Sequence, residues 1–340
     1  MIEVKNVTKK YGSFVAVNDI SFSIQDGEIV GFLGPNGAGK STTMNMITGY
    51  IEPTEGSIVI NGYDMAKKPN KAKKEIGYMP ESVPLYGELT VKEFVTYMAE
   101  LKKVAKQEKK KQVEEVMKET GLEEVQKKLI RNLSRGYKQR VSMAGALVGN
   151  PDVLILDEPT VGLDPKQITE IRNLIKSLGK KHTVILSSHI LSEVSQICKK
   201  VIIINKGTIV AVDTPQNLEN KVKDKNSILL TIEDPKNHIE NIKKKIPEIE
   251  EIKLIKDNQD GTKQYAIISK ENTDLRKQIF DILPKEEITI FELKQSEATL
   301  EDAFIKLIDT ERIEKKQEKE KDESEEKTKK KKIDKKGGKE

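Results

Sequence analysis

The sequence has 340 residues, of which 36% are hydrophobic and 34% are charged, and its formal net charge is +5. This length suggests about two domains, since a domain has roughly 150 residues. Aromatic residues make up only 4% and tryptophan is absent, which argues against a surface that stacks on bases. Because the net charge is also modest, no nucleic-acid partner is expected.

Three classes of protein are excluded by simple features of the chain. No run approaches the ~20 apolar residues of a membrane-spanning helix, and the first residues lack the basic and apolar segments of a secretory signal. The single cysteine, Cys198, allows no internal disulfide and fits a reducing cytosol. The sequence therefore predicts neither an integral membrane protein, nor a disulfide scaffold, nor a secreted protein.

The expected elements follow one another in an alternating order. Residues 20–24 alternate in polarity, Asp26 and Gly27 form a turn, and residues 28–33 resume as a strand, which predicts a β-hairpin. The next elements are a glycine-rich loop at 34–39, a helix at 40–49, a strand at 57–60, a long helical stretch at 91–118, a short helical segment after 121, a helix at 134–147, a strand at 153–156, a helix from 164, a strand at 183–187, a hairpin at 201–212 and a helix from 214. This alternation predicts an α/β core.

Three of these helices begin with capping signals. Thr90 and Glu93 have the spacing of a capping box. Ser134 is a suitable N-cap for the helix that follows it, and Asp164 precedes a proline in the first turn.

The pattern changes after about residue 220. Strands are expected at 227–233, 250–256, 265–269 and 287–293, helices at 235–245 and 272–283, and a short amphipathic helix at 300–308. The order resembles β-α-β-β-α-β, a small α+β domain. We therefore predict a first domain at 1–220, an accessory domain at 221–310 and a tail at 311–340.

The tail is expected to be disordered. It holds 13 Lys/Arg and 10 Asp/Glu in 30 residues and cannot bury enough apolar surface to order itself. Its lysine cluster at 329–332 could contact anionic lipid, but the mixed charges favour a solvated extension.

A phosphate-binding loop is the clearest motif. Residues 34–41 match the pattern G-x-x-x-x-G-K-[ST] between an expected strand and an expected helix. Small residues let backbone N–H groups wrap the phosphates, and the helix N-terminus adds partial positive charge. Lys40 would reach the β- and γ-phosphates, and the Ser41 hydroxyl would bind Mg²⁺. The candidate ATP contacts are Asn36, Gly37, Ala38, Gly39, Lys40, Ser41 and Thr42.

Two carboxylates end the apolar strand at 153–156. Taken alone, such a strand is compatible with an ordinary buried strand that has a polar exit. Beside a phosphate loop we expect Asp157 to hold Mg²⁺ through its water shell and Glu158 to act as general base on the attacking water.

Residues 133–140, Leu-Ser-Arg-Gly-Tyr-Lys-Gln-Arg, resemble the signature motif of ATP-binding-cassette (ABC) ATPases. The phosphate loop (Walker A), the acidic strand end (Walker B), Asp164 in the D-loop motif Gly-Leu-Asp and the switch histidine His189 follow the order and spacing of that family, and Tyr11 matches its adenine-stacking aromatic. The resemblance covers residues 1 to about 220. It implies an α/β, ABC-type P-loop core with a helical subdomain at about 88–148.

The resemblance also implies a dimer. Two such domains, identical or different, would sandwich two ATP molecules head to tail. Ser134 and Gly136, at a helix start, would meet the γ-phosphate held by the other protomer, in agreement with the anion preference of helix N-termini. His189 would contact the γ-phosphate and orient the attacking water, and Asp164 would connect the two sites.

The sequence departs from the common family pattern at three positions. Glu81 stands where Gln is usual; it still offers oxygen to Mg²⁺ but adds negative charge near the phosphates. Arg135 and Tyr137 are variants within the signature, and Arg135 either faces ATP or points to solvent. These variants resemble a branch of bacterial two-component exporters whose ATPase is a separate chain, often with a small C-terminal domain and a helix like the one expected near Phe304.

The favoured function is therefore the ATPase subunit of an ABC transporter of the exporter type. We expect it to lie in the cytoplasm, at the inner face of the cell membrane, and to drive a separate multi-span permease. The alternative is a non-transport ABC ATPase acting on ribosomes or DNA. Two features argue against this alternative. Each motif occurs once, whereas the ABC proteins of translation carry two cassettes in one chain, and no segment is long enough for the coiled coils of chromosome and repair proteins. Specificity for the cargo is expected to lie in the membrane partner.

Overall fold

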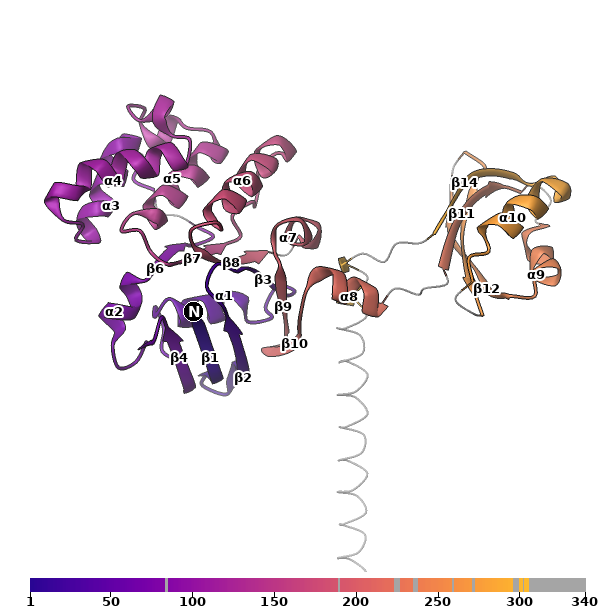
Figure 1. Cartoon of the computed structure of the whole chain (residues 1–340), viewed down its shortest axis with the longest axis horizontal. Helices are drawn as coiled ribbons and strands as arrows, with labels where there is room; N and C mark the ends of the chain where they lie inside the picture. Colours follow the sequence, from indigo (N-terminus) through magenta and orange to yellow (C-terminus); the bar gives the residue numbers. More distant parts are fainter. Residues whose placement is uncertain are drawn as a thin grey trace, which may run out of the picture. The chain divides into compact units, whose positions relative to one another are not determined.

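The computed structural model describes residues 1–82, 85–188, 190–222, 227–234, 238–258, 260–270, 273–295, 300–301 and 303–305 (Figure 1). Contacts group the chain into two compact units, one built on Met1–Asn217 and one on Leu218–Ala303. The tail expected at 311–340 lies outside the described residues. In the part that is described, no helix combines the length and the apolar character needed to cross a membrane.

A six-stranded sheet forms the centre of the first unit. Its strand order is β10-β9-β3-β8-β7-β6, and only the edge strand β10 is antiparallel to its neighbour. Every residue of β3, β7 and β8 is buried, as expected for parallel strands covered on both faces. The bounds are β3 Ile29–Leu33, β6 Ile76–Met79, β7 Val153–Asp157, β8 Thr183–Ser188, β9 Lys200–Asn205 and β10 Thr208–Asp213.

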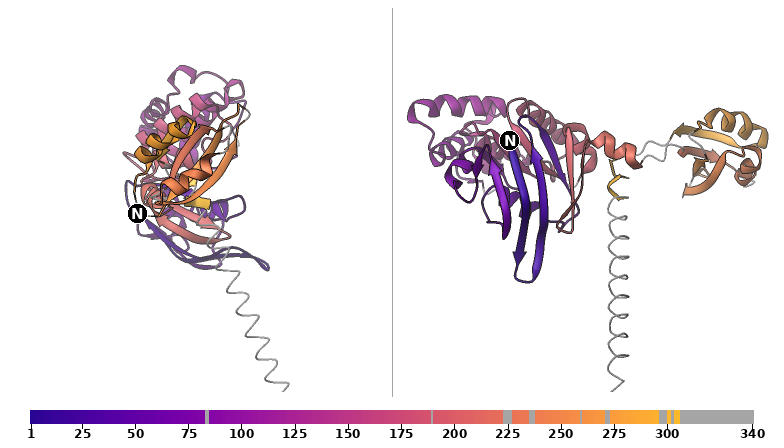
Figure 2. Two further views of the ribbon diagram at one scale, coloured as in Figure 1. Left: turned by 90° about the vertical axis from the view of Figure 1, so that its right-hand side faces the viewer. Right: turned by 60° about the horizontal axis from the view of Figure 1, so that its bottom comes forward.

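A second, antiparallel sheet has the order β2-β1-β4-β5. Figure 2 shows its long strands β1 and β2 side by side in indigo. The bounds are β1 Ile2–Tyr11, β2 Phe14–Ile24, β4 Glu55–Ile60 and β5 Tyr63–Asp64. Side chains from both sheets and from helix α1 (Lys40–Ile47) form one buried apolar cluster, so α1 is packed between β-structure on both sides.

The expected hairpin across Asp26 and Gly27 was wrong. Strand β2 pairs with β1, whereas β3 pairs with β8 and β9 in the other sheet. The turn therefore carries the chain from one sheet to the other. Strand β2 is only half buried and alternates in exposure, whereas β3 is buried throughout, so the two strands suit different environments.

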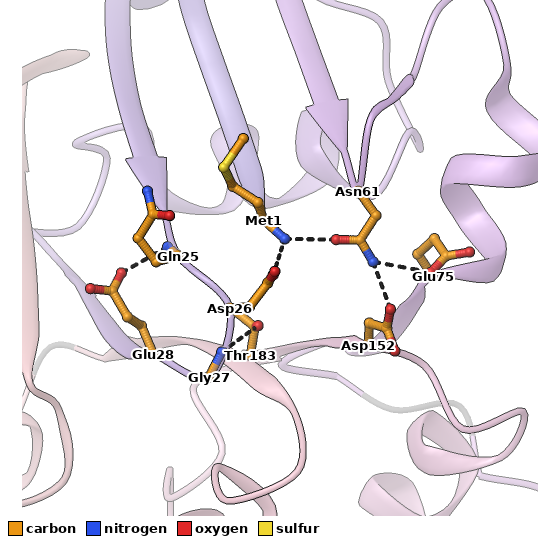
Figure 3. A network of polar contacts seen from close by, with 9 residues as sticks. All are labelled: Met1, Gln25, Asp26, Gly27, Glu28, Asn61, Glu75, Asp152 and Thr183. Atoms are coloured by element: carbon orange, nitrogen blue, oxygen red, sulfur yellow. Dashed lines mark hydrogen bonds and ion pairs between the residues drawn. The ribbon is translucent and has the colours of Figure 1, made fainter.

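A polar network holds this turn in place (Figure 3). The backbone N–H of Gly27 donates to the Thr183 hydroxyl at 3.0 Å. The Met1 amino group donates to the carboxylate of Asp26 and, at 2.7 Å, to the side-chain oxygen of Asn61. The Asn61 amide in turn donates to Glu75 and Asp152 at 3.1 and 2.8 Å. Gly27, Glu75 and Asp152 come just before strands of the parallel sheet and Thr183 begins one, so the network lies at the edge opposite the phosphate loop.

The helices of the first unit are grouped around the sheets. Helices α3, α4 and α5 pack on one another and form the helical region. The α-helices are α1 Lys40–Ile47, α2 Pro69–Lys74, α3 Val91–Leu101, α4 Lys106–Glu119, α5 Arg135–Leu147, α6 Pro165–Leu178 and α7 Leu191–Ile197, and α8 Pro215–Val222 follows them; two short 3-10 helices are η1 Glu123–Val125 and η2 Ile130–Asn132. The capping signals are confirmed: Thr90 and Glu93 form a capping box, and Ser134 and Asp164 cap α5 and α6.

The single long helical stretch expected at 91–118 was also wrong, because the chain breaks it into α3 and α4. Lys103 has a positive φ of 57° at the break, a conformation that ends a right-handed helix. Next to it, the Lys102 ammonium donates to the carbonyl oxygens of Ala146 and Val148, both at 2.7 Å. Burial lowers the pKa of Lys102 to about 8. The break thus places a lysine on the last carbonyls of α5, a tertiary contact that no local pattern encodes.

We expect Lys102→Ala to lower the free energy of unfolding by about 2 kcal/mol, because two carbonyls at the end of α5 lose their donor. Urea denaturation followed by circular dichroism measures the change. Lys106→Ala is the matched control, since Lys106 is exposed at the start of α4 and its loss should change stability by less than about 0.5 kcal/mol. Equal effects of the two substitutions would contradict this role of Lys102.

The second unit confirms the predicted order β-α-β-β-α-β. Its antiparallel sheet has the order β12-β13-β11-β14, the arrangement of a ferredoxin-like unit. Buried isoleucines and leucines of the strands and helices form a separate core. The bounds are β11 Ser227–Glu233, η3 His238–Asn241, α9 Ile242–Lys245, β12 Ile249–Asp257, β13 Lys263–Ser269, α10 Arg276–Ile282, η4 Leu283–Glu286 and β14 Thr289–Gln295. Most of the helix expected at 300–308 lies outside the described residues.

Candidate functional site

The phosphate-binding loop joins β3 to α1 at the carboxyl edge of the parallel sheet. Gly39 caps α1 with φ 107°, and Gly37 has φ 77°, values that glycine adopts at little cost. At Gly34 a Cβ atom would lie 2.3 Å from the carbonyl oxygen of Ile204, so only glycine fits there. The loop therefore needs its glycines for backbone conformation and for packing against β9.

Lys40 is buried at the first position of α1, with 8% of its surface exposed. Its ammonium donates to the carbonyl oxygens of Gly34 and Pro35, at 2.8 and 3.2 Å. Burial lowers the pKa of Lys40, and the carboxylates of Glu158, Asp157 and Glu81 oppose that effect. The side chain thus lies folded over the loop, where its donors are available to phosphate oxygens.

Asp157 and Glu158 lie where strand β7 ends. The Ser187 hydroxyl, on the neighbouring strand β8, donates to Asp157. Burial raises the pKa of Asp157; the Ser187 bond and Lys40 lower it, and Glu81 raises it further. Two carboxyl groups are therefore fixed side by side next to the only lysine of the loop.

Glu158 has a strained backbone. Its φ is 49°, in the left-handed region that non-glycine residues rarely adopt. Its N–H donates to the carbonyl and the hydroxyl oxygen of Ser187, at 3.2 and 3.1 Å, and the residue is 8% exposed. Such strain is found at functional sites, where the surroundings hold a side chain in one direction.

A cavity of about 550 Å³ collects most of the predicted ATP contacts. Its lining contains Asn36, Gly37, Gly39, Lys40, Ser41, Thr42, Glu81 and Glu158, together with Phe14, Ala16 and Val161. Ala38 is buried behind the loop, where its carbonyl accepts a hydrogen bond from Gly207 at 2.9 Å. One hollow therefore brings the phosphate loop, the lysine and the candidate base together.

The aromatic wall of the cavity differs from the sequence expectation. Phe14 lines the cavity, whereas Tyr11 does not line it and is half exposed. The centroid of the Tyr11 ring lies 5.3 Å from the Lys9 ammonium nitrogen. The two aromatic residues face each other as partners of the β1–β2 pair. Phe14 was not among the residues predicted from the sequence; the short connection after Tyr11 was the signal that could have found it.

The predicted signature residues lie at the start of α5 and do not line this cavity. The Ser134 hydroxyl accepts a hydrogen bond from the N–H of Tyr137 at 3.4 Å. Gly136 is buried, and a Cβ atom there would lie 3.0 Å from the Gln167 side chain. Asp164 accepts from the N–H of Gln167 at 2.9 Å. His189 falls outside the described residues.

Oxygen donors suitable for Mg²⁺ gather at the same edge of the sheet. Glu81 and Ser41 line the cavity, and Asp157, at the end of β7, interacts electrostatically with Glu81 and Lys40. Hydroxyl and carboxylate oxygens are ligands that Mg²⁺ accepts together with substrate phosphates. Among the described residues no group of three or more His, Cys, Asp or Glu side chains is arranged to hold a metal ion.

A phosphate loop at the end of the buried parallel strand β3, with acidic residues at the end of β7, one strand further along the same sheet, defines the class of P-loop nucleotide-hydrolysing proteins. The ABC transporter family model matches residues 17–161, and a model described as an AAA domain, putative AbiEii toxin, matches residues 129–195. The linearmycin resistance ATP-binding protein LnrL of Bacillus subtilis is 39% identical over 68% of this chain and 75% of its own length.

Two further similarities extend this result. The bacitracin transport ATP-binding protein BcrA of Bacillus licheniformis is 35% identical over 91% of this chain and 97% of its own length. A solved dimeric ATP-binding cassette in a post-hydrolysis state with ADP and Pi has a TM-score of 0.57 and 30% identity, over 63% of this chain and 98% of that one. The chain belongs to the ATP-binding proteins of ABC transporters, and it is an ATPase.

Proposed function

We propose that this protein binds Mg·ATP in the 550 Å³ cavity and drives a separate membrane permease that exports its cargo. The observation that carries the proposal is the cavity itself, because it joins the phosphate loop, Lys40 and Glu158 in one place. Residues 1–220 form the nucleotide-binding domain in this proposal, with the helical subdomain at about 88–148, and residues 221–310 form an accessory domain.

The residues of the proposed site have distinct roles in hydrolysis. The N–H groups of the loop and the start of α1 bind the phosphates, and Lys40 moves its donors from the loop carbonyls to the β- and γ-phosphate oxygens. Ser41, Asp157 and Glu81 would hold Mg²⁺, which when bound neutralises the phosphate charge. Glu158 orients a water toward the γ-phosphorus and accepts its proton, and His189 contacts the γ-phosphate.

The adenine contact is proposed for the aromatic pair at the β1–β2 end. Base stacking on an aromatic ring is worth about 1–3 kcal/mol, so we expect Tyr11→Ala/Phe14→Ala to weaken ATP binding by about tenfold. Titration with a fluorescent ATP analogue measures the affinity, and each single variant shows which ring contributes more. Phe280→Ala, an exposed phenylalanine of the second unit, is the control. A loss below twofold in the double variant would contradict the contact.

The catalytic unit is proposed to be a dimer. Ser134 and Gly136, at the start of α5, do not line the cavity of their own chain, so in this proposal they meet the γ-phosphate bound by a second protomer. The similar cassette with ADP and Pi is itself dimeric, which supports this arrangement. The second protomer is either another copy of this chain or a different ATPase subunit.

Mixing two inactive variants tests the shared site. Lys40→Ala disables the phosphate loop, and Ser134→Glu places a carboxylate against the phosphate; each homodimer should be inactive. A mixed dimer contains one intact loop opposite one intact signature, so ATPase activity should return on mixing. Ser134→Thr, which keeps the cap, is the control for Ser134→Glu. No recovery, with mixed dimers present in native mass spectra, would contradict a site shared between protomers.

Export and a membrane location are supported by relatives. LnrL is named for linearmycin resistance and BcrA for bacitracin transport, and both names fit removal of a compound from the cell. We therefore place the protein at the inner face of the cell membrane, bound to a multi-span permease that determines the cargo.

A further inference from the structure

Helix α7 contains a buried glutamate, an uncommon position for a carboxylate. Only 7% of the surface of Glu193 is exposed, and apolar residues of the same short helix are buried with it. A carboxylate that leaves water has to recover hydrogen bonds from the protein, because its desolvation is otherwise costly. Glu193 therefore depends on a polar partner inside the fold.

That partner belongs to the segment that follows the candidate base. The Thr160 hydroxyl donates to Oε2 of Glu193 at 2.6 Å, a length typical of a hydroxyl that donates to a carboxylate. Thr160 is itself 3% exposed, so water has little access to either partner. The bond ties α7 to a residue that comes two positions after Glu158 in the chain.

The segment between β7 and α6 is folded into consecutive tight turns. The N–H of Val161 donates to the carbonyl of Glu158 at 3.3 Å. The N–H of Leu163 donates to the carbonyl of Thr160 at 3.2 Å, the pattern of a second β-turn. Val161 also lines the nucleotide cavity. A shift of these turns would therefore move both the wall of the cavity and the candidate base.

Two side chains from neighbouring elements hold this segment. Ser187 of β8 accepts hydrogen bonds from the N–H of Glu158, at its carbonyl and its hydroxyl oxygen. Glu193 of α7 accepts the hydroxyl of Thr160 within the turns. A strained backbone such as that of Glu158 persists only where its surroundings hold it, and these contacts lie at the strained residue and just after it.

Helix α7 is in turn fixed against the strand that leads into the phosphate loop. A Cβ atom on Gly31 of β3 would lie 2.3 Å from Cγ1 of Val194, so the helix packs directly on the backbone of that strand. The N–H of Ile190 donates to the Ser188 hydroxyl at 3.0 Å, which ties the start of the helix to β8. One helix therefore relates the position of the base to that of the phosphate loop.

We propose that Glu193 is a positioning residue for ATP hydrolysis. Its bond to Thr160 fixes the turns after Glu158 and so keeps that carboxylate directed at the attacking water. The described lining of the nucleotide cavity does not include Glu193, so the residue acts through Thr160 and not on the nucleotide. The inference rests on the proposed role of Glu158 as general base.

Loss of this bond should slow hydrolysis without weakening nucleotide binding. Because a misplacement of about 1 Å can cost about 10²-fold in rate, we expect Glu193→Ala to lower kcat by about ten- to hundredfold while KM for ATP changes by less than about twofold. Thr160→Val, which keeps the shape but lacks the donor, should act in the same way. The double variant should be no slower than either single variant, since both remove one bond.

Conservative variants test whether the hydrogen bond itself matters. Glu193→Gln keeps an acceptor oxygen and Thr160→Ser keeps the hydroxyl, so both should retain most of the activity. The matched control is Glu93→Ala, because it removes the same kind of bond, from the Thr90 hydroxyl at 2.8 Å, at the start of α3. This control should lower stability and leave kcat unchanged.

Steady-state ATP turnover of the full chain measures kcat and KM, and thermal melting shows which variants are folded. If Glu193→Ala does not fold, Thr160→Val provides the test, since it preserves the side-chain volume. Single-turnover phosphate release in a Glu158→Gln background adds a second readout. In that background Glu193→Ala should cause no further loss, because the carboxylate that it positions is already absent.

The outcomes separate this inference from the proposed function. Normal turnover in Glu158→Gln would overturn the general base itself. An unchanged kcat in Glu193→Ala and Thr160→Val, with Glu158→Gln inactive, would overturn only the positioning role. An equal loss in Glu193→Gln and Glu193→Ala would do the same, because charge and not the hydrogen bond would then matter. A loss that persists in the Glu158→Gln background would show that Glu193 acts through another group.

Discussion

Replacing Glu158 by Gln should reduce ATP turnover by about 10²–10⁴-fold, the range of general-base catalysis, while ATP still binds. The amide has the same shape as the carboxylate but cannot accept the proton of the attacking water. The backbone of Glu158 is held by two hydrogen bonds to Ser187, so the side chain of the variant should keep its direction. ATP that binds and is not hydrolysed should trap the dimer.

Steady-state phosphate release and size-exclusion chromatography with light scattering measure these two effects. Glu114→Gln, at an exposed position of α4, is the matched control and should leave both unchanged. Turnover within threefold of the parent protein would remove Glu158 from the role of base. A variant that neither binds nor hydrolyses ATP would instead indicate a damaged site.

Replacing Lys40 by Ala should weaken ATP binding by about 100-fold. Hydrogen bonds to charged groups contribute about 1.5–3 kcal/mol each, and Lys40 is the buried cation of the cavity. The substitution also removes the donor to the carbonyls of Gly34 and Pro35, so the loop loses an internal contact as well as its phosphate contact. The effect should therefore appear in binding itself and not only in turnover.

Equilibrium titration with a fluorescent ATP analogue measures this loss. Lys110→Ala, an exposed lysine of α4, should bind like the parent protein. Normal affinity in Lys40→Ala would show that the loop does not hold the phosphates in the way proposed.

Local signals in the sequence predicted most of the fold. The capping residues Thr90, Ser134 and Asp164 begin helices as expected, because a cap acts on backbone groups a few residues away. The two errors have a common physical reason. The turn at Asp26 and Gly27 and the break at Lys103 depend on partners that are distant in the chain, namely Thr183 and the end of α5.

The residues of the candidate site show the same contrast between local motifs and contacts that depend on the fold. The phosphate loop and the acidic end of β7 are continuous motifs, and their residues meet in or beside one cavity. Phe14 belongs to no motif and was missed, because a cross-strand pair with Tyr11 brings it to the cavity. The roles assigned to the site residues, Tyr11 and His189 among them, stay predictions.

The most direct measurement is a pull-down from detergent-solubilised membranes, with the Glu158→Gln variant and ATP as bait and the Lys40→Ala variant as control. If the protein drives a separate permease, a multi-span membrane protein should be recovered by the first bait and depleted with the second. Recovery of ribosomes or DNA-associated proteins, with no membrane protein, would contradict the proposed transport function.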